Sequence, residues 1–79
     1  MNRLRDLRED KDLRQKDIAQ ILEMSQTGYS QYETETNDIP TSILKKLALY
    51  YDTSIDYLLC MTNEKKPYLR RKNEVDDKK

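Results

Sequence analysis

Residues 13–33 read LRQKDIAQILEMSQTGYSQYE, and this stretch decides the fold. Ile18, Ala19 and Leu22 recur at the spacing of one helix face, which predicts a helix over residues 15–22. Ala19 is the smallest of the three, so a neighbouring helix can approach closely at that point. The pattern therefore predicts a short helix with a buried face that can receive a second helix.

The second helix is predicted over residues 26–33. Ser25 precedes it and can cap its first turn, while Tyr29 and Tyr32 lie on its inner face. Only a short break at Met24 separates the two helices, so they must cross steeply, at about 90–120°. This is the geometry of a helix-turn-helix.

The outward face of this second helix carries neutral side chains that are short or end in an amide. Glutamine can bond N6 and N7 of adenine together, and threonine can contact the thymine methyl group or a base edge. Taken alone, such a face could equally be an ordinary solvated surface. On a helix-turn-helix it predicts a major-groove reading surface, made of Gln26, Thr27, Gly28, Ser30 and Gln31.

Three further helices are predicted around this pair, and no strand pattern is visible, so the fold class is all-α. The first covers residues 2–10. The fourth opens at Pro40, which suits a first helical turn, with Thr41 as its cap, and Ser54 can cap the fifth. The apolar positions predicted for these helices are Met1, Leu4, Leu7, Leu44, Leu47, Ala48, Tyr51, Ile55, Leu58 and Leu59.

The composition excludes most enzyme classes. The 79 residues contain no His, one Cys and one Gly. Without histidine, a Ser/His/Asp triad and a His-ligated metal are impossible, and one cysteine removes every zinc site that needs two thiolates. One glycine excludes the glycine-rich loops that hold phosphates. We therefore expect no enzyme, metal site, cofactor or small-molecule ligand.

The sequence also lacks signals for export or membrane insertion. No apolar run approaches ~18 residues, and residues 1–6 lack the apolar segment of a signal peptide. The lone Cys60 is typical of a reducing compartment. We expect a cytoplasmic protein.

The 15 basic and 15 acidic residues balance, but they are segregated along the chain. Residues 17–44 hold five acids and no base, so a reading surface there would depend on hydrogen bonds more than on bulk attraction. The apolar pattern ends near residue 61, which divides the chain into a domain at 1–61 and a charged, flexible tail at 62–79. The tail bases either contact phosphates or only keep the chain soluble; they are Arg70, Arg71 and Lys72.

With these motifs, the chain resembles the lambda-repressor-like helix-turn-helix domains of the XRE type. The resemblance covers residues 3–59, and its strongest parts are LREDKDLRQKDIAQIL at 7–22, MSQTGYSQYET at 24–34, IPTSILKKLA at 39–48 and DTSIDYLL at 52–59. It implies a compact five-helix domain whose third helix reads the major groove. It also implies a homodimer that binds a palindromic operator and acts as a transcriptional repressor.

The resemblance implies roles for residues outside the reading helix as well. Gln15 matches a glutamine that contacts a phosphate and supports the reading helix. Arg8 and Glu33 match a buried ion pair that ties the first helix to the end of the third. The predicted contacts to DNA phosphates are Arg14, Gln15, Lys16, Ser25 and Thr34.

Four residues depart from the pattern of that family. Arg14 stands where a Thr, Ser or Asn cap is usual, so the second helix should lose a cap worth about 1 kcal/mol. Asp12, Glu23 and Glu35 stand where glycines are usual. If Glu35 keeps a positive φ it is strained; if it does not, the loop after the third helix takes a different path.

Apolar residues at positions that are often polar in such helices predict a dimer surface on the fourth and fifth helices. Burial in the core of the monomer is the competing explanation. A different function would keep the fold but use it for a protein partner, as an antitoxin-like or adaptor module. The predicted dimer residues are Leu49, Tyr50 and Tyr57, bordered by Leu59 and Cys60.

Overall fold

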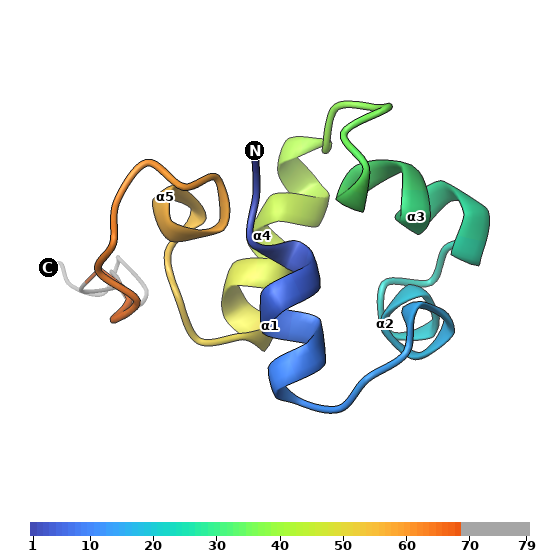
Figure 1. The fold of residues 1–79 in the computed structure, drawn as a ribbon, viewed down its shortest axis with the longest axis horizontal. Helices are drawn as coiled ribbons and strands as arrows, with labels where there is room; N and C mark the ends of the chain where they lie inside the picture. Colours follow the sequence, from blue (N-terminus) through green and yellow to red (C-terminus); the bar gives the residue numbers. More distant parts are fainter. Residues whose placement is uncertain (69–79) are drawn as a thin grey trace, which may run out of the picture.

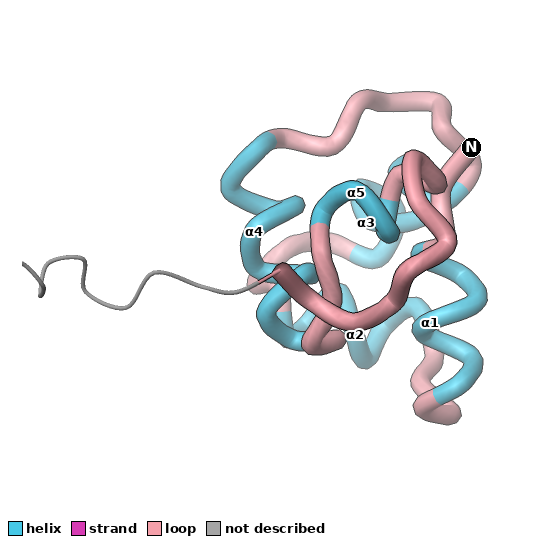
Figure 2. Tube along the Cα trace, turned by 90° about the vertical axis from the view of Figure 1, so that its left-hand side faces the viewer, coloured by secondary structure: helices cyan, strands magenta, loops and turns pink. Residues whose placement is uncertain are grey.

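The computed structural model describes residues 1–68, and every regular element in that range is a helix. The predicted all-α class with five helices is confirmed. Helices α1 and α4 lie between the α2–α3 pair on one side and α5 on the other (Figures 1 and 2). The bounds are α1 Leu4–Asp10, α2 Gln15–Ile21, α3 Gln26–Glu33, α4 Thr41–Tyr50 and α5 Ile55–Leu58.

Each helix contributes one completely buried side chain to a single core. These side chains are 0% exposed, and partly buried apolar residues such as Ile43 and Ile55 pack around them. Apolar burial is the main force that holds such short helices together, because none of them is long enough to be stable alone. The five core residues are Leu4, Ile18, Tyr29, Leu47 and Leu58.

The start of α1 differs from the prediction. The helix begins at Leu4, and Met1, predicted as part of its apolar stripe, is 88% exposed. The Leu4 N–H donates to Asn2 Oδ1 (3.1 Å), and the Arg3 N–H donates to the Leu58 carbonyl (2.8 Å). These bonds hold residues 2 and 3 outside the helix, so the prediction of a helix from residue 2 was wrong.

Two of the three predicted serine or threonine caps are confirmed. Ser25 Oγ accepts from the Gly28 N–H (3.0 Å) at the start of α3, and Ser54 Oγ accepts from Tyr57 N–H (3.0 Å) at the start of α5. The third cap was wrong, because Pro40 occupies the cap position and Thr41 is already helical. Threonine therefore cannot accept from the first turn of α4 in the way that the serines do.

Every described helix ends in the same motif. The second residue after the helix has a positive φ, between 53° and 63°, and its N–H donates three residues back. The N–H of the next residue donates five residues back, to the same final turn. This arrangement usually carries glycine at the positive φ. In this chain the five residues are Asp12, Glu23, Glu35, Asp52 and Cys60.

Residues 62–68 run back along the helical body. Thr53 Oγ1 donates to the Lys65 carbonyl (2.6 Å), and Tyr68 Oη donates to Asp56 Oδ2 (2.7 Å). The division at residue 61 and the flexibility of the tail stay predictions. The tail bases Arg70, Arg71 and Lys72 lie outside the described residues.

Within residues 1–68, no helix is long and apolar enough to cross a membrane. The same residues contain no cluster of three or more His, Cys, Asp or Glu side chains that could hold a metal ion.

Candidate nucleic-acid interface

Helices α2 and α3 form the predicted crossing pair. Figure 1 looks almost along the axis of α2 and at the side of α3, so the two helices cross steeply. Ala19, the small residue expected at their contact, is 2% exposed, and the Met24 N–H donates to its carbonyl in the turn (2.9 Å). Tyr29 fixes α3 against the core with a side chain that is completely buried.

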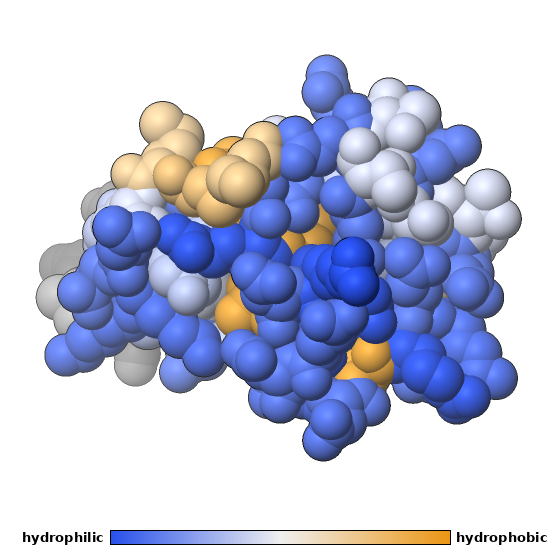
Figure 3. Space-filling model, viewed as in Figure 1, coloured by the Kyte–Doolittle hydropathy of each residue, from blue (hydrophilic) through white to orange (hydrophobic). Residues whose placement is uncertain are grey.

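The opposite side of α3 faces solvent. Ser25, Gln26 and Thr27 are exposed at its start, while Gly28, Ser30 and Gln31 are half-buried. The surface over α3 and the loop that follows it shows pale patches among blue ones in Figure 3, so weakly polar side chains are mixed with strongly hydrophilic ones. The predicted base-facing residues therefore lie on one side of one helix, from its first turn to its last.

Contacts inside the protein explain why residue 28 is a glycine. A Cβ atom at this position would lie 3.1 Å from Ser25 Oγ and 3.2 Å from Met24 Cε. Both distances are tighter than an ordinary van der Waals contact, and the Ser25 hydroxyl is held in place by its cap. The glycine thus lets the cap of α3 form without strain.

Basic residues at the start of α2 lie beside the start of α3. Arg14, Lys16 and Gln26 line one surface hollow of about 390 Å³, together with Met24. Arg14 and Lys16 are both exposed. The structure thus brings two predicted phosphate contacts next to one predicted base contact.

The end of α3 is held by a network of charged and amide groups. Arg8 Nε donates to Glu33 Oε2 (2.6 Å) and Arg8 Nη2 donates to Glu33 Oε1 (3.1 Å), so the pair is bidentate. Only 11% of the Arg8 side chain and 5% of the Glu33 side chain are exposed. Gln15 Nε2 donates to Glu33 Oε1 (3.1 Å), and Arg8 Nη1 donates to the Leu13 carbonyl (2.9 Å). The network joins α1, α2 and α3.

The network also sets the ionisation of its members. Burial alone would raise the pKa of Glu33, but hydrogen bonds from Arg8 and Gln15 hold this pKa below its ordinary value. The pKa of the Tyr29 phenol is raised, first by burial and then by its contact with the Glu33 carboxylate. The Tyr29 hydroxyl is buried and lies near this carboxylate. Glu33 is therefore held as a carboxylate against the core.

Gln15 supports α3 and keeps part of its amide free for a further partner. One N–H of its amide is used by Glu33, which leaves a second N–H and the amide oxygen. Gln15 and Thr34 line a hollow of about 310 Å³ with Arg8 and Glu33. The hydroxyl of Thr34 donates to the Ser30 carbonyl (3.2 Å), so this group mainly closes the end of α3.

The start of α2 keeps a cap despite the missing Ser or Thr. The Asp17 carboxylate accepts from the Arg14 N–H (2.9 Å), which is one half of a capping box; the Arg14 side chain cannot supply the other half because it has no acceptor. The Arg14 N–H bond, followed by the Arg14 guanidinium (Nε to Oδ2, 3.3 Å), lowers the pKa of Asp17. The expected loss of a cap is therefore partly offset.

The acids of residues 17–44 are less available than their number suggests. Asp17 pairs with Arg14 and Glu33 pairs with Arg8. Glu35 accepts from the amino group of Met1 (2.6 Å). Three of the five acids in this range are thus paired, which lowers the repulsion that a DNA phosphate would meet.

One contact on this surface was not predicted. Asn37, in the loop after α3, donates from Nδ2 to Gln31 Oε1 (2.6 Å). The two residues are also joined through the backbone, since the Asn37 N–H donates to the Gln31 carbonyl (3.2 Å). Nothing in the sequence marks this pair, because it depends on the path of the loop, which the φ of Glu35 decides.

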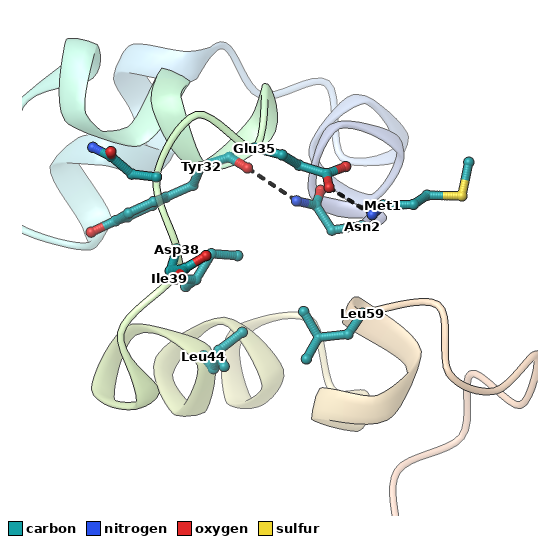
Figure 4. Close-up of a pocket in the computed structure, with 9 residues that line it drawn as sticks. Met1, Asn2, Tyr32, Glu35, Asp38, Ile39, Leu44 and Leu59 are labelled. Atoms are coloured by element: carbon teal, nitrogen blue, oxygen red, sulfur yellow. Dashed lines mark hydrogen bonds and ion pairs between the residues drawn. The ribbon is translucent and has the colours of Figure 1, made fainter.

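A separate cleft of about 360 Å³ opens between the N-terminus, the loop after α3, and the last two helices. In Figure 4, Leu44 points toward it from α4 and Leu59 from the end of α5. Glu35 and Asp38 line its rim. The predicted base-facing and phosphate-facing residues do not line this cleft, and its two carboxylates disfavour an anionic ligand.

The predicted dimer residues do not form one patch. Leu49 is 63% exposed and Tyr50 is 38% exposed, and the Lys11 ammonium lies 5.7 Å from the Tyr50 ring, after the end of α1. Tyr57 is half-buried under the Arg3 guanidinium, 4.1 Å away, at the start of α1. Tyr50 and Tyr57 therefore lie near opposite ends of α1, Tyr50 beside Lys11 after the helix and Tyr57 beside Arg3 before it.

An apolar area covers the surface over α5 and the adjoining N-terminus (Figure 3). Met1 and Met61 are among the most exposed apolar side chains of the described chain. Leu59 and Cys60, which follow α5, are half-buried beside them. This area adjoins the part of the predicted dimer surface that lies at α5, where Leu59 and Cys60 border it.

Comparison with known proteins gives one family and two relatives. The Helix-turn-helix family model matches residues 4–58, well over half of the chain. YobD of Bacillus subtilis (strain 168), named an uncharacterized HTH-type transcriptional regulator, is 37% identical over 71 residues, which are 90% of this chain and 63% of that protein. The HTH-type transcriptional regulator ImmR of the same organism is 35% identical over 74 residues, 94% of this chain and 54% of that protein.

The chain spans less than two thirds of the length of either relative. No solved structure matches the chain significantly.

Proposed function

We propose that this chain, which belongs to the XRE-type helix-turn-helix family, is a DNA-binding repressor of transcription that occupies a palindromic operator as a homodimer. In this proposal α3 enters the major groove, and the starts of α2 and α3 face the phosphates on either side. The base contacts are Gln26, Thr27, Gly28, Ser30 and Gln31, and the phosphate contacts are Arg14, Gln15, Lys16, Ser25 and Thr34.

The observation that supports this proposal most directly is the two-sided character of α3. Tyr29 and Glu33 fix one side of the helix to the core, and the other side offers neutral hydrogen-bonding groups to solvent. A merely solvated helix face needs no buried network behind it. A surface that must match base edges to within hydrogen-bond distance does, because its side chains must be held in fixed positions.

We place the dimer contact on the α5 half of the predicted surface. Met61 is 74% exposed and the neighbouring Leu59 is half-buried, and exposed apolar areas are uncommon on surfaces that have no partner. Met61→Lys should therefore shift the protein toward monomers in sedimentation runs at several concentrations. Leu49→Lys, on α4, is the matched control and should leave the distribution unchanged. The opposite result would move the contact to α4.

The test of DNA recognition is an in vitro selection from random duplex DNA with the purified protein. We expect a palindromic motif whose half-sites lie about 34–36 Å apart, one turn of the double helix. Enrichment of a single half-site would contradict the dimer, and enrichment of no sequence would overturn the proposed function.

Repression is tested separately in a reporter assay. With the selected operator placed over a promoter, expression of the chain should lower the reporter signal, because a bound dimer blocks access to the promoter. Gln26→Ala should restore the signal if it is produced at the same level. A rise in the reporter signal with the wild-type chain would identify an activator instead.

The use of the fold for a protein partner, as an antitoxin-like or adaptor module, has weaker support. The acidic character of residues 17–44 would favour a protein partner over DNA, but three of those five acids are engaged in ion pairs. The selection experiment separates the two functions, since only the DNA-binding protein enriches a sequence.

A further inference from the structure

The side chain of Gln31 is held by Asn37. The amide of Asn37 donates from Nδ2 to Gln31 Oε1 over 2.6 Å. The backbone N–H groups of Thr36 and Asn37 both donate to the Gln31 carbonyl, at 2.9 and 3.2 Å. Main chain and side chain of the loop thus bond to the same residue, which fixes the position of Asn37 relative to the last turn of α3.

The loop reaches this position because of the turn at Glu35. Its φ of 63° reverses the chain at the end of α3 and brings the next two residues back over the helix. A hydrogen bond between the hydroxyls of Thr34 and Thr36 (2.9 Å) braces the turn. A positive φ is costly for a residue other than glycine, so the path is set by the contacts of the whole loop.

We propose that Asn37 holds the Gln31 amide in one of its two orientations, and that Gln31 thereby distinguishes an A·T pair from a T·A pair. The inference rests on the proposed function, because it requires α3 to lie in the major groove.

The reasoning depends on the order of donor and acceptor in an amide. Glutamine carries an acceptor oxygen next to a donor NH₂ group, and a half-turn of the amide exchanges them. Adenine offers its N7 acceptor and its N6 donor in a fixed order across the groove, and this order is reversed when the adenine lies on the other strand. An amide that turns freely can match both orders, whereas one that is held matches only one.

The bond from Asn37 leaves the reading groups of Gln31 free. The oxygen Oε1 has two lone pairs, of which Asn37 uses one, so the other can still accept from N6 of adenine. Both hydrogens of Nε2 remain available for N7. Asn37 is therefore a positioning residue, which acts on the base pair through Gln31.

The test compares variants in the same selection from random duplex DNA. Gln31→Ala identifies the base pair that Gln31 reads, because preference disappears there. At that pair we expect the wild-type chain to favour one orientation roughly tenfold or more, as for a bidentate contact, and Asn37→Ala to reduce the ratio to about threefold or less. This ratio compares two operators in one pool, so a general loss of folded protein does not change it.

Asn37→Asp gives the sharper result. A carboxylate cannot donate, so it should accept from Nε2 of Gln31 and turn the amide over, which moves the preference toward the opposite orientation. Asp38→Ala is the matched control in the same loop, because the exposed Asp38 side chain forms no hydrogen bond within the described residues, and it should leave the ratio unchanged.

Two outcomes would count against the inference, and they are distinguishable. If Gln31→Ala abolishes the preference but both Asn37 variants keep the wild-type ratio, Asn37 does not position the amide and the proposed function stands. If the wild-type chain enriches no sequence, the proposed function fails and this inference fails with it.

Discussion

The two faces of α3 are held in different ways. The inward face is fixed by a fully buried Tyr29 and by Glu33, which lies in a nearly buried network with Arg8. The outward face begins with Gln26 and Thr27, which are exposed and form no side-chain hydrogen bond within the described residues. The first face is built for rigidity, and the start of the second leaves its hydrogen-bonding capacity unused.

The difference suggests that stability and sequence preference are separable in this domain. Changes on the inward face should alter the free energy of unfolding, and changes on the outward face should alter base discrimination. Substitutions on each face test whether the two properties are independent.

The largest effect is expected at Arg8. Arg8→Ala leaves Glu33 as a buried charge without its bidentate partner, which should lower the free energy of unfolding by about 3–5 kcal/mol. Chemical denaturation followed by circular dichroism measures the loss. The matched control is Arg5→Ala, because Arg5 pairs with Glu9 on the exposed side of α1 and should cost less than about 1 kcal/mol. Equal losses at both positions would show that the burial of the pair is unimportant.

The same network predicts how stability depends on pH. The pKa of Glu33 is lower in the folded protein than in the unfolded chain, so its contribution is complete above the ordinary pKa of a glutamate. That contribution is lost as the pH falls through the lowered pKa. The free energy of unfolding of the wild-type chain should therefore fall more steeply in acid than that of Glu33→Gln. Parallel curves would assign the acid sensitivity to other carboxylates.

The outward face should show the opposite behaviour. Gln26→Ala should weaken binding to the selected operator by about 1–3 kcal/mol and relax the preference at one base pair, while the melting temperature stays the same. Gln20→Ala removes an exposed glutamine from α2, outside the predicted contacts, and serves as the control. A large loss of stability in Gln26→Ala would mean that the two faces are not independent.

The sequence was sufficient to predict the inward face and the element order. The apolar spacing and the serines at positions 25 and 54 predicted where α3 and α5 begin, and the structure agrees. Local patterns of this kind depend on neighbours along the chain. The cap of α2 was missed because Asp17 supplies from the third helical position what Arg14 cannot.

The sequence predicted which residues of α3 face outward, but not how the Gln31 side chain is held. The sequence raised the question of whether Glu35 keeps a positive φ, and the structure answers it with 63°. The contact between Asn37 and Gln31 depends on this turn together with the other contacts of the loop. No local pattern supplies this contact, because it also depends on how the loop packs back over α3.

A smaller effect on the free energy of unfolding is expected at the helix ends, where residues other than glycine have a positive φ. Glu23 follows α2 with a φ of 60°, where glycine would meet no steric penalty. Glu23→Gly should raise the free energy of unfolding by roughly 0.5–1 kcal/mol, measured by denaturation, because the relief of strain exceeds the added flexibility of the unfolded chain. Glu23→Ala keeps the Cβ atom and should bring no such gain. If both variants stabilise equally, the benefit comes from removing the charge.

The smallest effect on stability is expected at Gly28, where the two faces of α3 meet. Alanine favours a helix over glycine by about 1 kcal/mol, but its Cβ atom would lie 3.1 Å from Ser25 Oγ and 3.2 Å from Met24 Cε. The Met24 methyl can move away, whereas the hydroxyl cannot without weakening the cap, so the two effects should nearly cancel and leave stability within about 0.5 kcal/mol. Binding should weaken nevertheless, because Ser25 is a proposed phosphate contact and moves with the cap. A variant that gains the full helix preference and binds as before would show that the glycine serves neither the cap nor the DNA.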